Sequence, residues 1–412
     1  MQNWAGNITY SATRLAEPES VEELQTIVAG AAAVRAVGSG HSFSPVADTT
    51  GTLVSLRNLA LPTVIDAEAR TATVPAGARY TEVTADLDAR GWALPNLGSL
   101  PHITVGGACA TGTHGSGDRN RNLAGAVVGV EFVRGDGELV RCALGEPEFA
   151  GSVLALGALG IATRMTLRLE PAYSMRQDVF TDLPLDRAAE RVDDIFAAAY
   201  SVSLFSDFAR PDVLDLVWCK SRGDAPPSAA FLGTPADRER HPTPGLAATG
   251  TSPQLGAVGP WHERLPHFDP SHNPSTGDEL QSEYFLPRHR AGAGLAALRA
   301  AAADFAGALQ VFEMRTIAAD DLWLSPCHGR DTVAAHFTWV SDFDLVRPAL
   351  AAVERALGPL DARPHWAKVF LAADRSTFES IYPRLPDFRA LADRHDPERR
   401  FGNDFVARYV YA

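Results

Sequence analysis

The alternation of apolar and polar positions predicts small α+β units in the first part of the chain. Ser20 and Glu23 form a capping box before a run with apolar residues at helical spacing, and Gly91 closes a second helical run. The expected helices cover 21–33 and 80–90, and the expected strands cover 8–15, 34–37, 52–56 and 71–74. These units are short and alternate irregularly, so the pattern favours an α+β fold.

Longer elements are expected further along the chain. Gly135-Asp-Gly137 is a hairpin signal between strands at 129–133 and 138–142, and an alternating strand at 165–170 ends at Pro171. The later helices are expected over 187–200, 289–308 and 346–357, and the later strands over 309–317, 333–340 and 364–371. Residues 221–278 are rich in Pro, Gly, Ser and His, and we expect them to be irregular.

Two glycine-rich segments are candidates for ligand contact. The first segment, Gly38-Ser-Gly-His41, follows the expected strand that ends at Val37. Its glycines allow positive φ and close approach of backbone amides to an anion. The second, 94–117, is dense in Gly, Ser and Thr but lacks the Walker A and G-x-G-x-x-G patterns. Either segment alone is also compatible with a tightly packed structural turn.

Charged and polar side chains lie between apolar neighbours on three late expected strands. Glu313 and Arg315 are two residues apart and share a sheet face, as do His336 and Thr338, while Lys368 lies between Trp366 and Phe370. A buried unpaired charge costs on the order of several kcal/mol, so these groups must pair, reach solvent or face a polar ligand. For one strand alone, a structural salt bridge is the simpler interpretation. Together, the residues favour the wall of a polyol pocket.

Composition narrows the class of partner. The chain has 412 residues, 46% of them hydrophobic, and a formal net charge of -13, which argues against nucleic acid. The four cysteines are scattered and the twelve histidines show no HExxH spacing, so we expect neither a disulfide framework nor a metal site. Without a signal peptide or a membrane-spanning apolar run, the expected location is the cytoplasm.

Four motifs occur together and in order along essentially the whole chain: Gly38-Ser-Gly-His-Ser-Phe43, Thr111-Gly-Thr-His-Gly-Ser116, Ala158-Leu-Gly-Ile-Ala-Thr163 and Arg363-Pro-His-Trp-Ala-Lys-Val-Phe370. This combination resembles the vanillyl-alcohol-oxidase superfamily of flavoproteins, and within it the alditol (xylitol) oxidases of the sugar-1,4-lactone oxidase branch. The resemblance implies an FAD-binding (PCMH-type) domain of two α+β subdomains and a substrate-binding cap domain with an antiparallel sheet. The implied parts are 1–172, 173–371 and a C-terminal segment, 372–412, that completes the flavin site.

The resemblance also assigns roles to individual residues. It implies FAD linked covalently through the flavin 8α-methyl group to His41. The implied substrate-binding residues are Ser99, Glu313, Arg315, Thr338 and Lys368, and the implied catalytic residues are Arg315, Lys368, Glu313 and His336, the last as a candidate proton acceptor. The implied cofactor-binding residues are Val37, Gly38, Ser39, Gly40, His41, Ser42, Ser99, Thr104, Gly107, Thr111, Gly112, Thr113, His114, Gly115, Ser116, Ile161 and His365.

The implied reaction is oxidation of the terminal primary alcohol of an alditol such as xylitol or sorbitol by a monomeric enzyme. The substrate gives a hydride to flavin N5, and O2 reoxidises the flavin with formation of H2O2. Gly98 is expected to lie against the flavin, where its missing side chain leaves a path for O2. Two alternatives stay open: an aldono-1,4-lactone oxidase or dehydrogenase of the same branch, and a flavin-bearing binding protein without catalysis.

Overall fold

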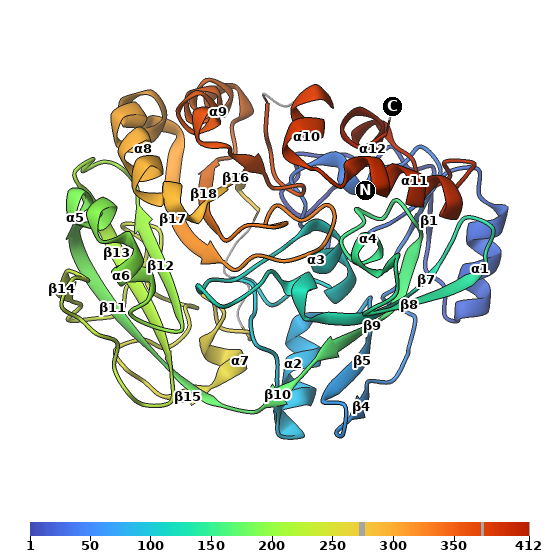
Figure 1. Cartoon of the computed structure of the whole chain (residues 1–412), viewed down its shortest axis with the longest axis horizontal. Helices are drawn as coiled ribbons and strands as arrows, with labels where there is room; N and C mark the ends of the chain where they lie inside the picture. Colours follow the sequence, from blue (N-terminus) through green and yellow to red (C-terminus); the bar gives the residue numbers. More distant parts are fainter. Residues whose placement is uncertain (272–276, 372–374, 412) are drawn as a thin grey trace.

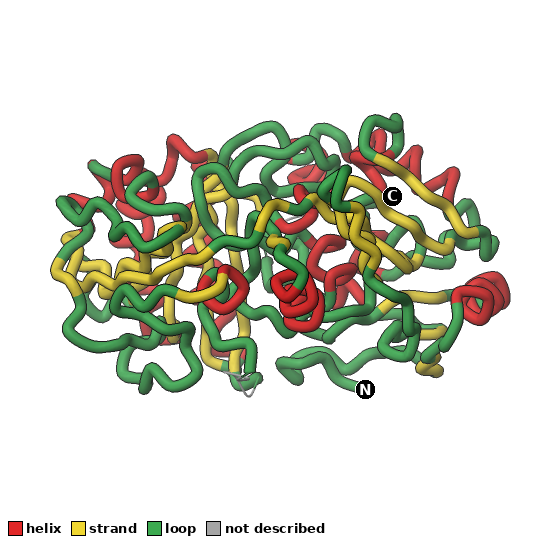
Figure 2. Tube along the Cα trace, turned by 90° about the horizontal axis from the view of Figure 1, so that it is seen from below, coloured by secondary structure: helices red, strands yellow, loops and turns green. Residues whose placement is uncertain are grey.

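The chain folds into an elongated molecule with a large sheet at one end and smaller sheets at the other (Figure 1, Figure 2). The structure is a computed structural model, and it describes residues 1–271, 277–371 and 375–411. Helices α10 (Arg375–Ile381), α11 (Leu385–His395) and α12 (Asp404–Tyr409) lie over the half that holds the smaller sheets and the N-terminus (Figure 1). The C-terminal segment therefore returns to the half where the chain begins.

Two small sheets form the first half of the molecule. A parallel sheet has the order β1-β3-β2, and an antiparallel sheet has the order β4-β5-β9-β7-β8. The strands are β1 (Arg14–Ala16), β2 (Val34–Ala36), β3 (Thr52–Val54), β4 (Val64–Asp66), β5 (Thr71–Pro75), β7 (Val127–Val133), β8 (Leu139–Ala143) and β9 (Ile161–Arg168), with a separate pair, β6 (Trp92–Ala93) and β10 (Glu170–Pro171). The helices are α1 (Val21–Gly30), α2 (Tyr80–Ala89), α3 (Val105–Thr111) and α4 (Phe149–Ser152).

A nine-stranded antiparallel sheet forms the other half. Its order is β14-β11-β13-β12-β17-β18-β16-β19, and β15 pairs with β11. The strands are β11 (Ser174–Pro184), β12 (Ser201–Ser206), β13 (Val213–Arg222), β14 (Thr234–Pro235), β15 (Gly259–Pro260), β16 (Glu279–Pro287), β17 (Leu309–Ile317), β18 (Thr332–Val340) and β19 (Arg363–Pro364). The helices are α5 (Leu185–Glu190), α6 (Val192–Phe196), α7 (Trp261–Arg264), α8 (Ala291–Phe305) and α9 (Phe343–Leu357).

Helices α8 and α9 pack on one face of the large sheet. Phe312, Phe337 and Trp339 point to that side and join Phe305 of α8 in a buried aromatic cluster. Because side chains alternate along a strand, the polar neighbours of these residues project from the opposite face. One face of the sheet is thus core, and the other is free for a binding site.

Buried polar contacts join the segments around the centre. The guanidinium of Arg35 donates to the carbonyls of Val46, Leu156, Gly157 and Phe401, so one cation joins two distant turns and the C-terminal segment. Burial lowers the pKa of Arg35 to about 10, which still leaves it charged at neutral pH. The segment after α3 docks on the large sheet, where the Gly117 amide donates to Thr316. These contacts fix the two halves around a common site.

Several expected elements are confirmed and others are wrong. Strands 309–317 and 333–340 correspond to β17 and β18, and helices 289–308 and 346–357 correspond to α8 and α9 with the short turns beside them. The strand expected over 8–15 is formed only at Arg14–Ala16, and the helix expected over 187–200 breaks at Arg191 into α5 and α6.

The strand expected over 364–371 is also wrong. Only Arg363–Pro364 pairs with β16, and the backbone then turns, with the Lys368 amide donating to His365 before Val369 rejoins β16 at Gln281. Lys368 therefore lies on a turn rather than on a strand. Strand β16 and helix α3 were not expected from the pattern. The expected boundary at 372 lies outside the described residues.

Candidate active site

A cavity of about 730 Å³ lies between the small sheets and the open face of the large sheet. This volume is within the usual range for cofactor and ligand sites. Most of the residues assigned to the cofactor by resemblance line it: Val37, Gly38, Ser39, Gly40, His41, Ser42, Ser99, Thr104, Gly107, Thr111, Thr113, His114 and His365. Gly112, Gly115, Ser116 and Ile161 are not part of the lining.

Those four residues support the lining from behind. Gly112 ends α3 in the left-handed conformation, with φ of 80°. Ser116 donates to the Val202 carbonyl, and Ile161 belongs to the core of the first half. A Cβ at Gly115 would lie 2.2 Å from the Leu97 carbonyl oxygen, so only glycine fits there. The cofactor roles expected for these four residues stay predictions.

The glycine turn after β2 packs tightly against the start of α3. A Cβ at Gly38 would lie 2.1 Å from Thr104 Oγ1, and Gly40 has φ of +69°. Both positions thus require glycine, one for space and the other for backbone conformation. The turn brings backbone amides to the cavity surface beside His41, which suits the close approach of a dinucleotide cofactor.

His41 is placed in the cavity wall as a neutral imidazole. Its ring lies 4.2 Å from the Trp4 ring, centroid to centroid. Burial lowers its pKa to about 4, with smaller contributions from Lys368 and His102. In the described part of the chain, no group forms a hydrogen bond with its ring nitrogens. An unprotonated imidazole with an available lone pair has the chemistry required to carry a flavin covalently, so the residues present fit FAD.

The polar residues of β17 and β18 face the cavity together. Glu313 pairs with His336 in the sheet register, and Arg315 and Thr338 extend the same face. Their intervening neighbours Phe312, Met314 and Phe337 are fully buried in the aromatic core. The expected sharing of faces is therefore confirmed, and β17 and β18 present carboxylate, guanidinium, imidazole and hydroxyl groups to one space.

Glu283 of β16 joins these groups, although the sequence did not single it out. Its Oε1 accepts from His114 Nε2 at 3.0 Å and from Arg315 Nη2 at 2.9 Å, and its Oε2 lies 3.3 Å from Lys368 Nζ. Burial alone would raise the pKa of Glu283, but Lys368, His114 and Arg315 lower it well below its usual value. The ionised carboxylate of Glu283 thus contacts both cations, Arg315 and Lys368. The only available signal was a charge inside an apolar strand at Ser282-Glu-Tyr284.

Arg315 connects the two buried carboxylates. Its Nε lies 3.4 Å from Glu313 Oε1, its Nη2 reaches Glu283, and its Nη1 donates to Ser99 Oγ at 3.1 Å. The salt-bridge interpretation and the pocket interpretation of these charges are therefore compatible, because the groups pair with one another and also line the cavity. The pairing offsets the cost of burying the charges.

Gln281 of β16 fixes the proton position on His336. The Gln281 amide nitrogen donates to Glu279, so its Oε1 faces the other way and accepts from Lys368 Nζ at 2.8 Å and from His336 Nε2 at 3.2 Å. A carboxylate can only accept and an ammonium can only donate, which determines the amide orientation. His336 consequently carries its hydrogen on Nε2, and its Nδ1 has no partner among the described residues. Burial and Lys368 lower the pKa of His336 well below its usual value.

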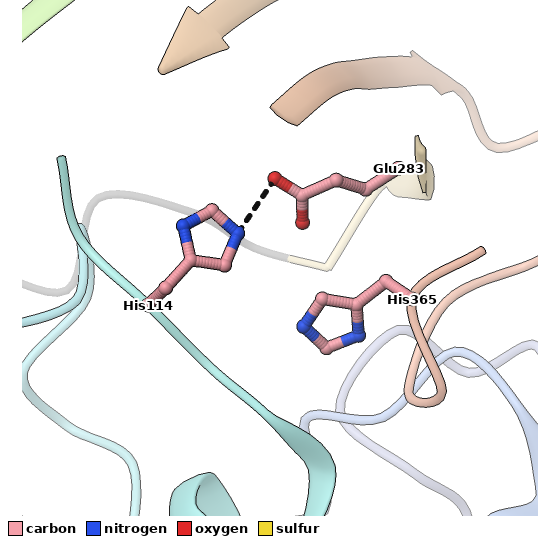
Figure 3. A group of neighbouring side chains, drawn as sticks. All are labelled: His114, Glu283 and His365. Carbon is pink, nitrogen blue, oxygen red and sulfur yellow. Dashed lines mark hydrogen bonds and ion pairs between the residues drawn. The ribbon is translucent and has the colours of Figure 1, made fainter. Parts of the chain in front are cut away.

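His114, Glu283 and His365 are also close enough to suggest a metal site (Figure 3). The picture shows all three side chains converging from different segments, with a hydrogen bond between His114 and Glu283. However, Arg315 and Lys368 already occupy both oxygens of Glu283. Two neighbouring cations oppose the binding of a divalent metal ion. The geometry favours a hydrogen-bonded charge cluster.

Comparisons with known proteins agree with this arrangement. Residues 12–143 match the family described as FAD binding domain, and residues 278–409 match the family described as D-arabinono-1,4-lactone oxidase. The chain is 48% identical to an alditol oxidase of a Streptomyces species over 98% of this chain and 97% of that protein. It is 28% identical to an L-gulono-1,4-lactone dehydrogenase of Mycobacterium tuberculosis, over 99% of this chain and 98% of that one.

Solved structures support the fold. A cholesterol oxidase from B. sterolicum superposes with a TM-score of 0.77 at 15% identity, covering 99% of this chain and 96% of that one. A solvent-stable cholesterol oxidase gives 0.76 at 15% identity, covering 98% and 96%. At such low identity the likeness concerns the fold alone, and it confirms the expected two-domain FAD-binding architecture. From this full-length identity and these matches, the chain belongs to the alditol oxidase family, in the sugar-lactone oxidase branch of the vanillyl-alcohol-oxidase flavoproteins.

Proposed function

We propose that this protein is an FAD-dependent alditol oxidase that converts the terminal primary alcohol of xylitol or sorbitol to the aldose and reduces O2 to H2O2. The observation that carries the proposal is the pair of buried cations, Arg315 and Lys368, held on Glu283 at the wall of a cavity that also contains His41. The 48% identity to an alditol oxidase over nearly the whole chain supports the same conclusion.

FAD, when bound, supplies the acceptor for a hydride from the carbinol carbon and passes the two electrons to O2. His41 would carry it through an 8α linkage, which prevents its loss. The protein holds the substrate against it and stabilises charge. The residues of the glycine turn and of α3 that line the cavity would bind its phosphates and ring.

The substrate hydroxyl groups would be bound by the polar wall. Arg315 and Lys368 would stabilise negative charge on the reacting oxygen, since fixed cations in a dry site act strongly on developing charge. Glu313 would accept a hydrogen bond from the adjacent hydroxyl, and Ser99 and Thr338 would orient the rest of the chain. His336, which lines the cavity, is the candidate acceptor for the hydroxyl proton.

The use of O2 is supported by Gly98. This residue lines the cavity, and a Cβ there would lie 3.4 Å from Thr113 Cγ2, in ordinary contact. An added methyl group would therefore fit but would fill space beside Thr113. We infer that the open space serves O2.

The part boundaries at 172 and 371, the monomeric state and the cytoplasmic location remain predictions from the sequence. No helix of the described chain is long and apolar enough to cross a membrane.

A substrate panel tests the proposal. The purified protein should form H2O2 with xylitol and sorbitol and turn them over faster than gulono- or galactono-1,4-lactone. The reverse preference would support the alternative function of an aldono-1,4-lactone oxidase or dehydrogenase. The match of residues 278–409 to the D-arabinono-1,4-lactone oxidase family is the reason to include lactones in the panel. Reduction of artificial acceptors without O2 consumption would contradict the oxidase assignment.

A further inference from the structure

A buried chain of three polar side chains runs from Lys220 in the core to two residues, His267 and Glu313, that line the cavity. Lys220 of β13 is 1% exposed, and its Nζ donates to the carbonyls of Leu265 and Pro266, both at 2.7 Å. The same Nζ lies 3.3 Å from His267 Nδ1. His267 Nε2 lies 2.7 Å from Glu313 Oε1. The chain Lys220–His267–Glu313 thus ends on a carboxylate that faces the cavity.

Donor and acceptor rules fix the direction of this chain. Burial lowers the pKa of Lys220 well below its usual value and Glu313 opposes this effect, but the three acceptors that surround Nζ match the three hydrogens of an ammonium group. A carboxylate can only accept, so His267 donates Nε2–H to Glu313 and presents the lone pair of Nδ1 to Lys220. Burial, opposed by Glu313 and reinforced by Lys220, lowers the pKa of His267 to about 4, which agrees with a neutral ring.

Only one oxygen of Glu313 is used in this way. Oε1 accepts the hydrogen bond from His267 Nε2 and lies 3.4 Å from Arg315 Nε in an ion pair, whereas no group of the described chain donates to Oε2. Glu313 itself lines the cavity. The bond to His267 therefore holds the carboxylate at an orientation in which its second oxygen remains available to a ligand.

The backbone of His267 is tied to the same site. Its amide donates to the Ser99 carbonyl at 3.1 Å, and its carbonyl accepts from the Ser252 amide at 2.9 Å. The ring also packs edge-on against Phe205 and Trp218. His267 is thus fixed from three sides and connects the Ser99 turn with Glu313.

We propose that His267, held by Lys220, is a positioning residue. It orients Glu313 so that Oε2 of Glu313 accepts a hydrogen bond from the substrate hydroxyl next to the reacting carbon. This inference rests on the proposed alditol oxidation. It assigns Lys220 and His267 to substrate selection, because the correct carboxylate orientation is needed only by substrates that carry this hydroxyl. Removing the hydrogen-bond partner of a metal ligand changes metal affinity or activity by about 10- to 100-fold, and we expect a loss of similar size for the partner of Glu313.

The test compares two substrates in three variants. For His267→Phe, kcat/KM for xylitol should fall about 10- to 100-fold, mainly through KM, whereas kcat/KM for a 2-deoxyalditol should change less than about threefold. His267→Gln keeps an N–H donor and should recover most of the xylitol activity. His262→Phe is the matched control: His262 lies in the same region beside Asp88, outside the cavity lining, and should leave both substrates unaffected.

Nitrogen-15 NMR of histidine-labelled protein provides a readout independent of activity. The His267 resonances, assigned by their loss in His267→Gln, should show a hydrogen on Nε2 and an unprotonated Nδ1 in the parent. In Lys220→Met, the positive charge next to Nδ1 is lost, so His267 should take up a proton at a higher pH than in the parent. Glu313 favours this protonation and Arg315 opposes it.

Equal losses for xylitol and the 2-deoxyalditol in His267→Phe would indicate a structural role and overturn the proposal. A hydrogen on Nδ1 alone in the parent would also overturn it. Failure of the parent to oxidise any alditol would instead contradict the proposed function, and the NMR result would still decide the geometry of the chain. If His267→Phe does not fold, as judged by its retained flavin and melting curve, the NMR result and the comparison of His267→Gln with the parent decide the question.

Discussion

Lys368 and Glu283 meet in the interior at 3.3 Å, Nζ to Oε2, although one lies on a turn near the end of the chain and the other on a strand of the large sheet. Lys368 also donates to Gln281, and Glu283 also accepts from Arg315 and His114. Burial lowers the pKa of Lys368, whereas the carboxylate of Glu283 raises it and so favours the protonated amine. The pair therefore defines where positive charge meets the substrate.

Glu283→Gln should destabilise the protein. The substitution leaves Arg315 and Lys368 without their shared carboxylate, and breaking a buried ion pair typically costs about 3–5 kcal/mol. Chemical denaturation at pH 7.5 measures the change in the free energy of unfolding. Glu398→Gln is the control, because Glu398 pairs with Arg400 on the surface and should contribute less than about 1 kcal/mol. A loss in Glu283→Gln no larger than in the control would contradict the role of this cluster.

Lys368→Met should slow substrate-dependent reduction of the flavin by two to three powers of ten. Loss of one fixed donor to an oxyanion costs roughly 3–4 kcal/mol of transition-state stabilisation. Anaerobic stopped-flow absorbance gives the rate, and Arg315→Met should behave in the same way. Rates within a factor of two of the parent would remove both residues from the chemistry.

His41→Ala should release FAD when the protein is precipitated with acid, whereas the parent pellet should stay yellow. The reason is that only the covalent bond survives loss of the fold. Absorbance of pellet and supernatant measures the partition. His102→Ala, which alters a different histidine lying near the cavity, should keep its flavin in the pellet. A yellow pellet from His41→Ala would exclude the linkage.

Stability should fall as the pH is lowered from about 6.5 to 4.5. His267 and His365 have pKa values lowered to about 4 and about 3, mainly by burial, and that of His336 is also well below normal. The unfolded chain takes up protons near pH 6.5 that the folded protein does not, so protonation favours unfolding. Together these groups should contribute on the order of a few kcal/mol in this range.

Two carboxyl groups, Asp396 and Asp320, act in the opposite direction, because burial raises the pKa of each. Burial raises the pKa of Asp320 to about 6, so its contribution makes the folded state more stable as the pH falls through that value. Glu283 and Glu313 have lowered pKa values and affect stability only below about pH 4.3, the ordinary value for Glu. Urea denaturation at pH 7.5, 6.0 and 5.0 tests the sum. A free energy of unfolding that rises steadily as the pH is lowered from 7.5 to 5.0 would contradict the neutral state of the buried histidines.

Local patterns predicted the site where function depends on alternation or on glycine. The spacing of Glu313, Arg315, His336 and Thr338 indicated one sheet face, and the turn at Gly38 indicated close backbone approach; both are present. Glu283, Gln281 and His267 could not be found in this way. Each lies in a segment without a distinctive motif, and its partners come from distant parts of the chain.

The error over residues 364–371 has a related cause. The alternation of polar and apolar residues around Lys368 resembles a strand, but Trp366 donates its indole N–H to the Leu324 carbonyl and the backbone turns at that point. Tertiary contacts decide such a case, because local propensity is a weak preference. The turn moves Lys368 to Gln281 and Glu283, which a continuous strand would not require.

The most direct test of the account is anaerobic addition of xylitol to the purified, yellow protein, followed by its absorbance spectrum. The oxidised flavin band should bleach within seconds and return on admission of O2, with one H2O2 formed for each flavin reoxidised. A band that stays unchanged with xylitol and sorbitol would contradict it and leave the protein as a flavin-bearing binding protein.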